Sequence, residues 1–316
     1  MPLLAFGQTH STLDPKGESA ARIADMAYLL FIGGGAVFAV VLALAGLALF
    51  GPQPVRAALR GTRLILAGGI AFPVLVLSAL LVHASLAAPA VLRRGETPAL
   101  RIEVAGEMWW WRVRYLDESG RTIAEGANEI HIPAQRPVEF VLVSSNVIHS
   151  FWIPSLAGKV DMIPGAVNRL RLSAAAPGVF RGQCAEYCGV QHANMALMVV
   201  ARPQAEFDAW LAAQARPAAA PAGPLQQQGM ALFLANGCAR CHAVRGTSAA
   251  GTLGPDLTHV GARLTLGAGV LPANAGTFAG WVADIQHIKP GSQMPAFHQF
   301  SGEQLRALGA YLEGLR

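Results

Sequence analysis

The stretch CAEYCGVQHANM, at residues 184–195, decides the fold of this chain and carries its densest chemistry. It holds two cysteines, Cys184 and Cys188, followed by His192 and Met195. Thiolate, imidazole and thioether groups are soft or borderline ligands, which select copper or a related transition metal over magnesium or calcium. Two cysteines this close can share one metal or bridge two metals with both sulfurs. The stretch therefore predicts a tight loop over a metal site, which we call the metal loop.

A second histidine is needed to balance this site, and it has to come from another part of the chain. His149, in the segment NVIHSFW at residues 146–152, is the best candidate. Zinc held by the two cysteines and the two histidines is an alternative, as is an exposed disulfide, but zinc would leave Met195 without a role. A mononuclear blue-copper site needs only one cysteine, so the second cysteine favours two coppers.

The composition indicates membrane segments. The chain has 316 residues, enough for two or three domains, and 53% of them are hydrophobic while only 14% are charged. This is more apolar than an ordinary soluble protein. The net charge of +5 is modest and no dense Lys/Arg patch is interleaved with aromatic residues, so we expect no nucleic-acid partner. The four cysteines form two local pairs, which favours metal or haem attachment over a disulfide framework.

Two long apolar segments, residues 23–50 and 64–92, predict a transmembrane helical hairpin. The first is uncharged except for Asp25 near its start, and the second has His83 as its single titratable group. Both exceed the roughly 20 residues that a helix needs to span the hydrocarbon core. Pro73 is expected to kink the second helix, which neighbouring helices can tolerate. Two buried core helices are the alternative.

Charge between the two segments predicts their orientation. The connecting residues 51–63 contain three arginines and no acid, so the positive-inside rule places this loop in the cytoplasm. Both termini, and everything from about residue 95 onward, are then extracytoplasmic. The apolar run at residues 1–9 is too short for a signal peptide and lacks a basic start.

The next part, residues 96–205, predicts an all-β domain. Short runs rich in Val, Ile, Trp, Tyr and Phe alternate with polar residues and are interrupted by Gly, Pro and Asn. Several short strands at this spacing imply a Greek-key sandwich or barrel. The predicted strands are 101–104, 110–115, 129–132, 138–144, 169–173, 178–181 and 196–201.

A helical domain is predicted for residues 225–316. It follows a short amphipathic helix at 204–215 and a Pro/Ala-rich linker, which together make residues 206–224 a connecting segment. The linker is expected to be extended and semi-rigid, at ~3.1 Å per residue. Ser301 followed by Gln304 offers a capping box for the last helix. The predicted helices of the domain are 225–236, 276–288 and 302–315.

This last domain contains the sequence CARCH at residues 238–242, which is the pattern of a c-type haem attachment. Cys238 and Cys241 would form thioethers to the haem, and His242 would bind the iron as the proximal ligand. A low-spin electron carrier needs a sixth ligand, and Met294 is preferred because Met/His ligation raises the reduction potential. A zinc half-site or a redox disulfide is the alternative, but no second cysteine pair is nearby. Rival sixth ligands are His259, His287 and His298.

The metal loop closely resembles that of cytochrome c oxidase subunit II. The resemblance extends to VIHSFWIPSLAGKVDMIPG at residues 147–165 and to WWWRVRY at residues 109–115, and it covers nearly all of residues 14–205. It implies a cupredoxin-like Greek-key barrel. On that fold His149 is expected just after one strand, and the metal loop is expected between the last two strands, at the same end of the barrel.

The C-terminal domain resembles a small class I cytochrome c. The resemblance rests on the C-x-x-C-H pattern, on Met294 and on GPDL at residues 254–257, a segment that packs on the haem edge in that family. The fold class implied by both resemblances is multi-domain. Residues 1–95 would hold the two-helix transmembrane hairpin, followed by the all-β cupredoxin-like barrel and the all-α cytochrome c domain.

The resemblance to subunit II implies a binuclear copper centre, CuA, with both cysteine sulfurs bridging the two coppers. Its implied ligands are Cys184 and Cys188 to both coppers, His149 and Met195 to one, and His192 and the backbone carbonyl of Glu186 to the other. Sharing one electron over two metals spreads the charge change, so little rearranges. The Glu186 side chain resembles the family's ligand to a magnesium ion shared with subunit I, and a carboxylate suits that hard ion. A solvated loop acid is the alternative.

The resemblance also assigns a route for electrons. Trp109 matches the exposed tryptophan through which the family receives electrons from cytochrome c, whereas Trp110 and Trp111 are expected at least in part in the core. Asp161 is a weaker match, to the interface with subunit I. The chain departs from the family at Asn146, where an acid is common, and at Met108, where glutamine is common. It also has no acid between residues 51 and 92, where many relatives place a proton-uptake carboxylate.

Together the resemblances imply the subunit through which electrons reach a proton-translocating haem–copper terminal oxidase, a cytochrome-c oxidase. Electrons would pass from cytochrome c or another donor to covalently bound haem c, then to CuA, and then to subunit I, where oxygen is reduced to water. Subunit I, with its haem a and CuB, would be the obligatory partner, accompanied by subunit III and membrane lipid. The chain would be a multi-pass protein of the bacterial inner membrane, with both termini and both cofactor domains on the periplasmic face.

Two alternative functions use the same residues. One is the CuA/haem c subunit that delivers electrons to a nitric oxide reductase, which only the partner would distinguish. The other is a membrane-anchored electron relay without an enzyme partner. Two membrane helices argue against the relay, since a simple anchor needs only one.

Overall fold

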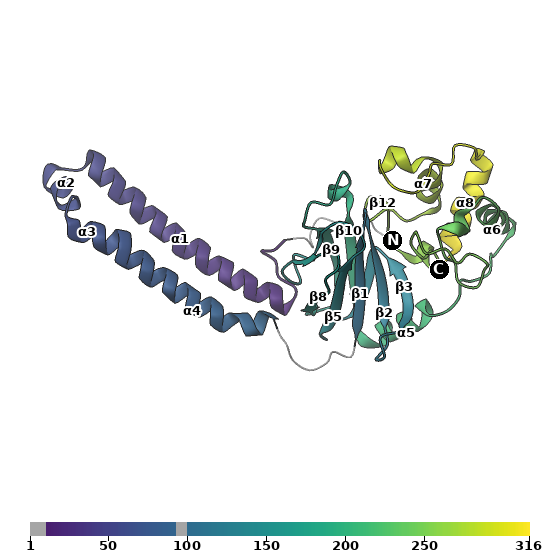
Figure 1. The fold of residues 1–316 in the computed structure, drawn as a ribbon, viewed down its shortest axis with the longest axis horizontal. Coiled ribbons are helices and arrows are strands. Elements are labelled where there is room, and N and C mark those ends of the chain that lie inside the picture. The colour runs from purple at the N-terminus through teal and green to yellow at the C-terminus, as the bar shows by residue number, and fades with distance from the viewer. Residues whose placement is uncertain (1–10, 93–99) are drawn as a thin grey trace. The chain divides into compact units, whose positions relative to one another are not determined.

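A computed structural model of the chain describes residues 11–92 and 100–316. In chain order it contains two long helices, a β-sandwich and a helical domain, which is the fold class expected from the sequence (Figure 1). The apolar run at residues 1–9 and the expected boundary near residue 95 lie outside the described residues.

The N-terminal helices form a hairpin of unusually apolar composition. Its elements are α1 (Glu18–Phe50), α2 (Gln53–Leu59), α3 (Thr62–Leu66), a π-helical turn (Ala67–Ala71) and α4 (Phe72–Leu92). The two candidate spans have mean hydropathies of 2.4 and 2.5, and none of the residues in these windows is buried within the chain. Core helices would be covered by other parts of the protein. The exposed apolar side chains therefore fit a lipid environment and not two buried core helices.

The second long helix is irregular just before Pro73. A proline has no backbone N–H, so Pro73 cannot donate to the carbonyl of Gly69, four residues earlier. That carbonyl lies inside the π-helical turn, which changes the spacing of the backbone hydrogen bonds. The structure thus has a π-helical turn just before the proline, and the kink expected at Pro73 stays a prediction.

Residues 101–202 form a sandwich of two five-stranded sheets. The strand order is β3-β2-β1-β5-β8 in one sheet and β4-β10-β9-β6-β7 in the other, with parallel pairs β1–β5 and β4–β10. The strands are β1 (Arg101–Glu107), β2 (Trp110–Leu116), β3 (Thr122–Ala127), β4 (Glu129–Pro133), β5 (Val138–Ser144), β6 (His149–Trp152), β7 (Val160–Met162), β8 (Asn168–Leu172), β9 (Gly178–Cys184) and β10 (Ala196–Arg202). Large apolar side chains such as Trp111, Phe140 and Phe151 are fully buried between the sheets, and each such side chain contributes ~1.5–3 kcal/mol through burial.

Strands β3, β6 and β7 were not predicted from the sequence, whereas the other strands of the sandwich were. His149 was expected just after one strand. It is the first residue of β6, where it pairs with Met162 of β7. This pairing with β7 restrains the backbone of His149.

The C-terminal helical domain is built from three main helices, which are α6 (Pro224–Ala235), α7 (Ala275–Ile288) and α8 (Gly302–Gly314). We call residues 225–316 the haem domain. Helix α8 starts with the predicted capping box between Ser301 and Gln304, and α7 has a second one, between Asn274 and Thr277, that was not predicted. The core of the domain includes Phe233, Leu308 and Tyr311.

The connecting segment is held along the haem domain. It begins with α5 (Gln204–Gln214), and irregular backbone follows. The Arg245 side chain donates to the carbonyl of Gln214 at 2.6 Å, and the Ala218 amide donates to the carbonyl of Arg245 at 2.9 Å. The Pro/Ala-rich residues are thus tied down by hydrogen bonds, and they do not act as a free spacer.

Candidate metal centre and haem site

The metal loop lies between β9 and β10 and gathers its sulfur atoms at one end of the sandwich. Strand β9 ends at Cys184 and β10 begins just after Met195. The Sγ atoms of Cys184 and Cys188 are 3.7 Å apart, and both thiols are free and buried. Met195 Sδ lies 3.8 Å from Cys188 Sγ, and His192 Nδ1 lies 3.6 Å from the same sulfur. The thioether of Met195 and the imidazole of His192 therefore both lie beside the Cys188 sulfur.

His149 completes the cluster from the neighbouring strand. Its Nδ1 lies 3.8 Å from Cys184 Sγ, and its ligand atom and those of the two cysteines all lie within 4.8 Å of one another. The carbonyl oxygen of Glu186 is 3.2 Å from Cys184 Sγ. All six residues predicted for the metal site from the sequence are thus brought together, with Glu186 contributing its backbone to the cluster.

Two residues hold the ring of His149 in place. Asn146 Oδ1 lies 3.1 Å from Nε2, which makes Nε2 the protonated nitrogen and leaves the lone pair of Nδ1 facing Cys184. Behind the ring is Gly106 of β1, where a Cβ atom would lie 2.6 Å from Cδ2 of His149. Only glycine leaves room for the imidazole at this point.

The electrostatics of the sulfur pair favour a thiolate. Hydrogen bonding from Cys188 lowers the pKa of Cys184 far below that of a free thiol. The same contact raises the pKa of Cys188. A thiolate is the metal-binding form of cysteine. Two sulfurs at bridging separation, two imidazole nitrogens, a thioether and a carbonyl exceed the four ligands of a structural zinc site and fit a pair of soft metal ions.

The haem domain contains a cavity of about 320 Å³, lined by Cys238, Cys241, His242 and Met294 together with apolar side chains. The Nδ1 of His242 is 2.8 Å from the carbonyl oxygen of Pro255, so this nitrogen carries the proton and Nε2 is available to a metal. Burial lowers the pKa of His242, which keeps the imidazole neutral.

Both His242 and Met294 line this cavity, so they could hold a haem from within it. A Cβ on Gly254 would lie 2.6 Å from Cε1 of His242, so glycine is required behind this imidazole as well. Gln286 donates to the carbonyl of Met294 at 2.9 Å and thereby fixes the segment that carries the thioether. Of the rival sixth ligands, His259, His287 and His298 are all described in the structure and none lines the cavity.

The three consecutive tryptophans have three different environments. Trp109 lines the haem cavity and donates from its indole Nε1 to the carbonyl oxygen of Cys188 at 2.8 Å. Trp110 also lines that cavity, beneath the guanidinium of Arg112, and is half-buried. Trp111 is fully buried and packs against Phe151, as expected for a core residue. Trp109 was expected to be exposed, and here it is partly covered by the haem domain.

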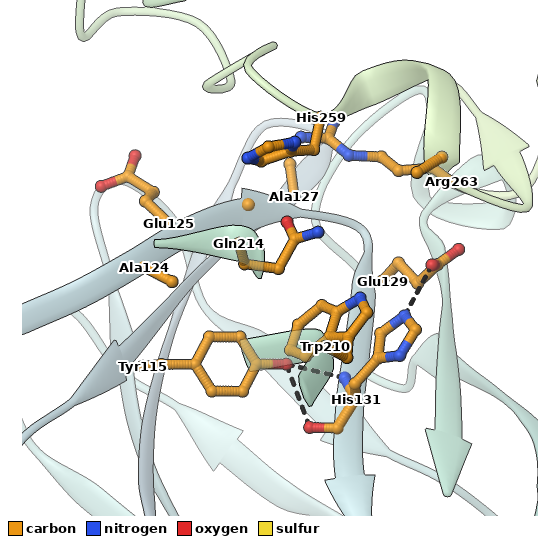
Figure 2. A pocket seen from close by; sticks show the side chains of 12 residues that line it. Tyr115, Ala124, Glu125, Ala127, Glu129, His131, Trp210, Gln214, His259 and Arg263 are labelled. Carbon is orange, nitrogen blue, oxygen red and sulfur yellow. Dashed lines mark hydrogen bonds and ion pairs between the residues drawn. The ribbon is translucent and has the colours of Figure 1, made fainter. Parts of the chain in front are cut away.

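A second, much smaller cavity lies where α5 and the haem domain meet the sandwich. Its volume is about 30 Å³, which is enough for one water molecule. His131 stacks on Trp210 with ring centroids 4.0 Å apart. Its Nε2 donates to Glu129, as Figure 2 shows, and its Nδ1 accepts from Arg202 at 2.9 Å. Both ring nitrogens are therefore used by the neutral imidazole, and burial lowers its pKa.

Fold and sites together define a cupredoxin-like domain with a sulfur-rich metal loop, joined to a cytochrome c domain and preceded by two apolar helices. Residues 101–202 match the family model "Cytochrome C oxidase subunit II, periplasmic domain", and residues 226–316 match "Cytochrome c". The chain belongs to the cytochrome c oxidase subunit II family through the first domain and carries a cytochrome c domain after it. These two domains imply copper and haem, respectively.

Two subunit 2 proteins are similar to the chain over more than two thirds of its length. Cytochrome c oxidase subunit 2 of Alkalihalophilus pseudofirmus is 40% identical over 215 residues, which are 68% of this chain and 61% of that protein. The Bacillus subtilis subunit is 34% identical over 228 residues, covering 69% of this chain and 63% of that protein. The match thus spans less than two thirds of each relative. The periplasmic domain of subunit II from Bradyrhizobium japonicum is 28% identical, with a TM-score of 0.35, and covers 38% of this chain and 95% of that structure.

Proposed function

We propose that this chain is the subunit through which electrons reach a haem–copper terminal oxidase, by way of covalent haem c and binuclear CuA. When bound, the haem and the two coppers supply one-electron redox chemistry. The observation that carries the proposal is the position of Trp109. Its indole lines the haem cavity and donates to the carbonyl of Cys188, so one side chain joins both sites.

The proposed ligand sets follow from the two clusters. Cys184 and Cys188 would bridge the coppers, with His149, His192, Met195 and the Glu186 carbonyl as the terminal ligands. Cys238 and Cys241 would hold the haem covalently, with His242 and Met294 as axial ligands. The short distances around both sulfurs and the shared cavity support these sets. The role of the chain is to hold these groups rigidly, so that little rearranges when an electron arrives.

Exposed apolar side chains beside the metal ligands support the proposal that a partner protein binds at this end of the sandwich. Ile148 precedes His149, Ile163 follows Met162 of the neighbouring strand, and Tyr187 precedes Cys188, and all three are exposed in the chain. Apolar side chains clustered on a surface mark an interaction site. We assign this surface to subunit I, with the Glu186 side chain as a ligand of a magnesium ion shared across the contact. Subunit III would complete the complex.

We further propose a bacterial inner-membrane location, with the loop around Arg56 and Arg60 in the cytoplasm and both cofactor domains in the periplasm. The membrane anchor would be residues 1–95, and the CuA domain would be residues 96–205. The connecting segment would be residues 206–224, and the haem domain would be residues 225–316. The test of the orientation is protease access in intact spheroplasts. The two cofactor domains should be digested, while a tag placed between α1 and α3 should be protected until the membrane is opened.

The experiment that tests the function is gentle solubilisation of the membrane followed by affinity purification of this chain. Co-purification of a multi-helix subunit with haem a, with cyanide-sensitive oxygen uptake, is the expected result. A partner that reduces nitric oxide in place of oxygen would replace the oxidase by the reductase. A chain that carries copper and haem but comes away alone would leave only an electron relay.

A further inference from the structure

Lys289 is a lysine buried between the haem domain and the sandwich. It is one of three lysines in the chain and follows the last residue of α7. Its exposed fraction is 3%, although lysine is rarely buried unless its ammonium group is paired. Among the described residues no carboxylate lies within ion-pair distance of it. Something other than a salt bridge therefore keeps this side chain inside.

Three carbonyl oxygens surround the ammonium group. Nζ of Lys289 lies 2.8 Å from the carbonyl of Trp109, 2.7 Å from that of Asn194 and 2.9 Å from that of Gly267. An ammonium group has three hydrogens, so each carbonyl can accept one. Two acceptors belong to the sandwich and one to the haem domain. The side chain thus ties the two domains together at a single point.

The two carbonyls on the sandwich belong to residues next to the proposed electron path. Trp109 is the residue whose indole donates to Cys188, and Asn194 precedes Met195 in the metal loop. Lys289 itself lines the haem cavity. The lysine therefore lies where the haem cavity, the tryptophan and the metal loop meet.

Neighbouring contacts act on the same segment. Gln191 donates to the carbonyl of Pro290 at 2.9 Å, and the amide of Ala196 donates to the carbonyl of Ala268 at 3.0 Å. Gly267, Ala268 and Gly269 all have positive φ, at 68°, 65° and 84°. This tight turn presents one carbonyl to Lys289 and the next to Ala196. The haem domain and the sandwich therefore have complementary hydrogen-bonding groups at this contact.

We propose that Lys289 is a positioning residue that holds the haem domain on the metal loop and so fixes the path from the haem cavity through Trp109 to Cys188. The inference rests on the proposed function for its consequence in electron transfer, but the docking itself does not. Without the ammonium group three carbonyl oxygens would face one another without a donor, and a buried polar group without a partner destabilises the contact that buries it. The haem domain would then separate from the loop, although the connecting segment would keep it nearby.

The test compares Lys289→Met, which keeps an unbranched side chain of nearly the same length but removes the donors, with Lys16→Met, which removes an exposed lysine elsewhere. The full chain, loaded with copper and haem, is used for both. Docking is read from hydrogen–deuterium exchange of the peptide that contains Ala196. Electron transfer is read by reducing the haem rapidly and following the copper absorbance. In Lys289→Met we expect faster exchange and at least a roughly tenfold slower transfer, equivalent to ~1.4 kcal/mol. Lys16→Met should resemble the parent.

Chemical rescue separates hydrogen bonding from space filling. Lys289→Ala lacks three methylenes and the ammonium group, which propylammonium can replace. Propylammonium should restore protection and transfer, and propanol should restore neither. If propylammonium and propanol restored protection and electron transfer equally, Lys289 would have only a space-filling role and the proposal would be overturned. If neither compound restored them, the proposal would be overturned as well.

Unchanged exchange and transfer in Lys289→Met would overturn the proposal as well. A parent chain that carries both cofactors but transfers no electron between them would instead refute the proposed function. In that case the exchange measurement would still decide whether Lys289 docks the two domains.

Discussion

Asn146 and His149 form a hydrogen bond in which the imidazole Nε2 donates to the amide oxygen at 3.1 Å. The bond fixes the tautomer of the histidine and turns Nδ1 toward Cys184. A carboxylate is common at this position in the family, whereas here the acceptor is a neutral amide. Asn146 Oδ1 also accepts from the amide of Val147 at 2.8 Å, so its own position is fixed.

Replacing Asn146 should therefore weaken copper binding without removing a ligand. We expect Asn146→Ala to lower copper affinity by ~10–100-fold, the usual cost of losing such a supporting hydrogen bond. Asn146→Asp keeps an acceptor and adds negative charge, so it should bind copper at least as well and lower the reduction potential of the centre. Copper competition with a chelator and a redox titration measure the two effects. Equal affinity in Asn146→Ala and the parent would remove the tautomer argument.

Adding a methyl group behind His149 should disturb the metal site. In Gly106→Ala the new Cβ would lie 2.6 Å from the imidazole, and overpacking of this kind costs ~1–3 kcal/mol. We expect lower copper content and a lower free energy of unfolding. Gly126→Ala is the matched control, because it lies on β3 with no atom within 4 Å of the added Cβ. If both variants take up copper like the parent, the close contact is not restrictive.

The same reasoning applies to the haem site. In Gly254→Ala the added Cβ would lie 2.6 Å from His242, so we expect reduced haem incorporation and a low-spin spectrum weakened in favour of high-spin haem. Gly280→Ala on α7 has open space around the added Cβ and serves as the control. Pyridine haemochrome assay and absorption spectra provide the readout. Normal incorporation with a parent-like spectrum would contradict the expectation.

Trp109→Phe should slow electron transfer between the two sites while leaving both loaded. Phenylalanine fills part of the indole volume but cannot donate to the carbonyl of Cys188. We expect a roughly tenfold or larger decrease in the internal transfer rate, equivalent to ~1.4 kcal/mol or more. Trp110→Phe, which alters a neighbouring ring without a contact to the metal loop, is the comparison. A rate that falls equally in both variants would not single out Trp109.

His131 should make the sandwich sensitive to acid. Its pKa is lowered in the folded chain, mainly by burial, while in the unfolded chain it is about 6.5. The unfolded state then binds the proton first, so the free energy of unfolding falls as the pH drops from about 6.5 toward the folded pKa. His131→Gln keeps a donor for Glu129 and an acceptor for Arg202 but does not titrate. Thermal unfolding should therefore show that the stability of His131→Gln falls less than that of the parent as the pH drops below about 6.5. A parallel decline in both proteins would assign the acid sensitivity elsewhere.

Local patterns predicted most of the architecture and both sites. Strand β5 (Val138–Ser144) was predicted at its observed bounds because β-branched and apolar residues follow one another there. Strands β6 and β7 are only a few residues long, so no alternation develops, and they form because β6 pairs with β9 and β7 pairs with β6. The metal site could be predicted from the sequence because four of its ligand side chains lie in one short segment.

What the sequence did not reveal depends on contacts between distant segments. Nothing local distinguishes Lys289 from a surface lysine at the end of a helix, and its three acceptors come from three separate parts of the chain. The rival sixth ligands could not be set aside until the fold showed which side chains line the haem cavity. His259 instead lies at the connecting segment, where its ring is 3.1 Å from the carbonyl of Arg216.

The backbone bond from Ala196 to Ala268 begins one residue after the metal loop ends. Together with the neighbouring contacts of Gln191, it covers one side of that loop with the haem domain. Copper delivered after the domain has closed must therefore approach from the opposite side, where Tyr187 is exposed. The contact between the two domains thus limits the side from which copper can enter the closed chain, and with it the surface available to any copper-delivery protein during maturation.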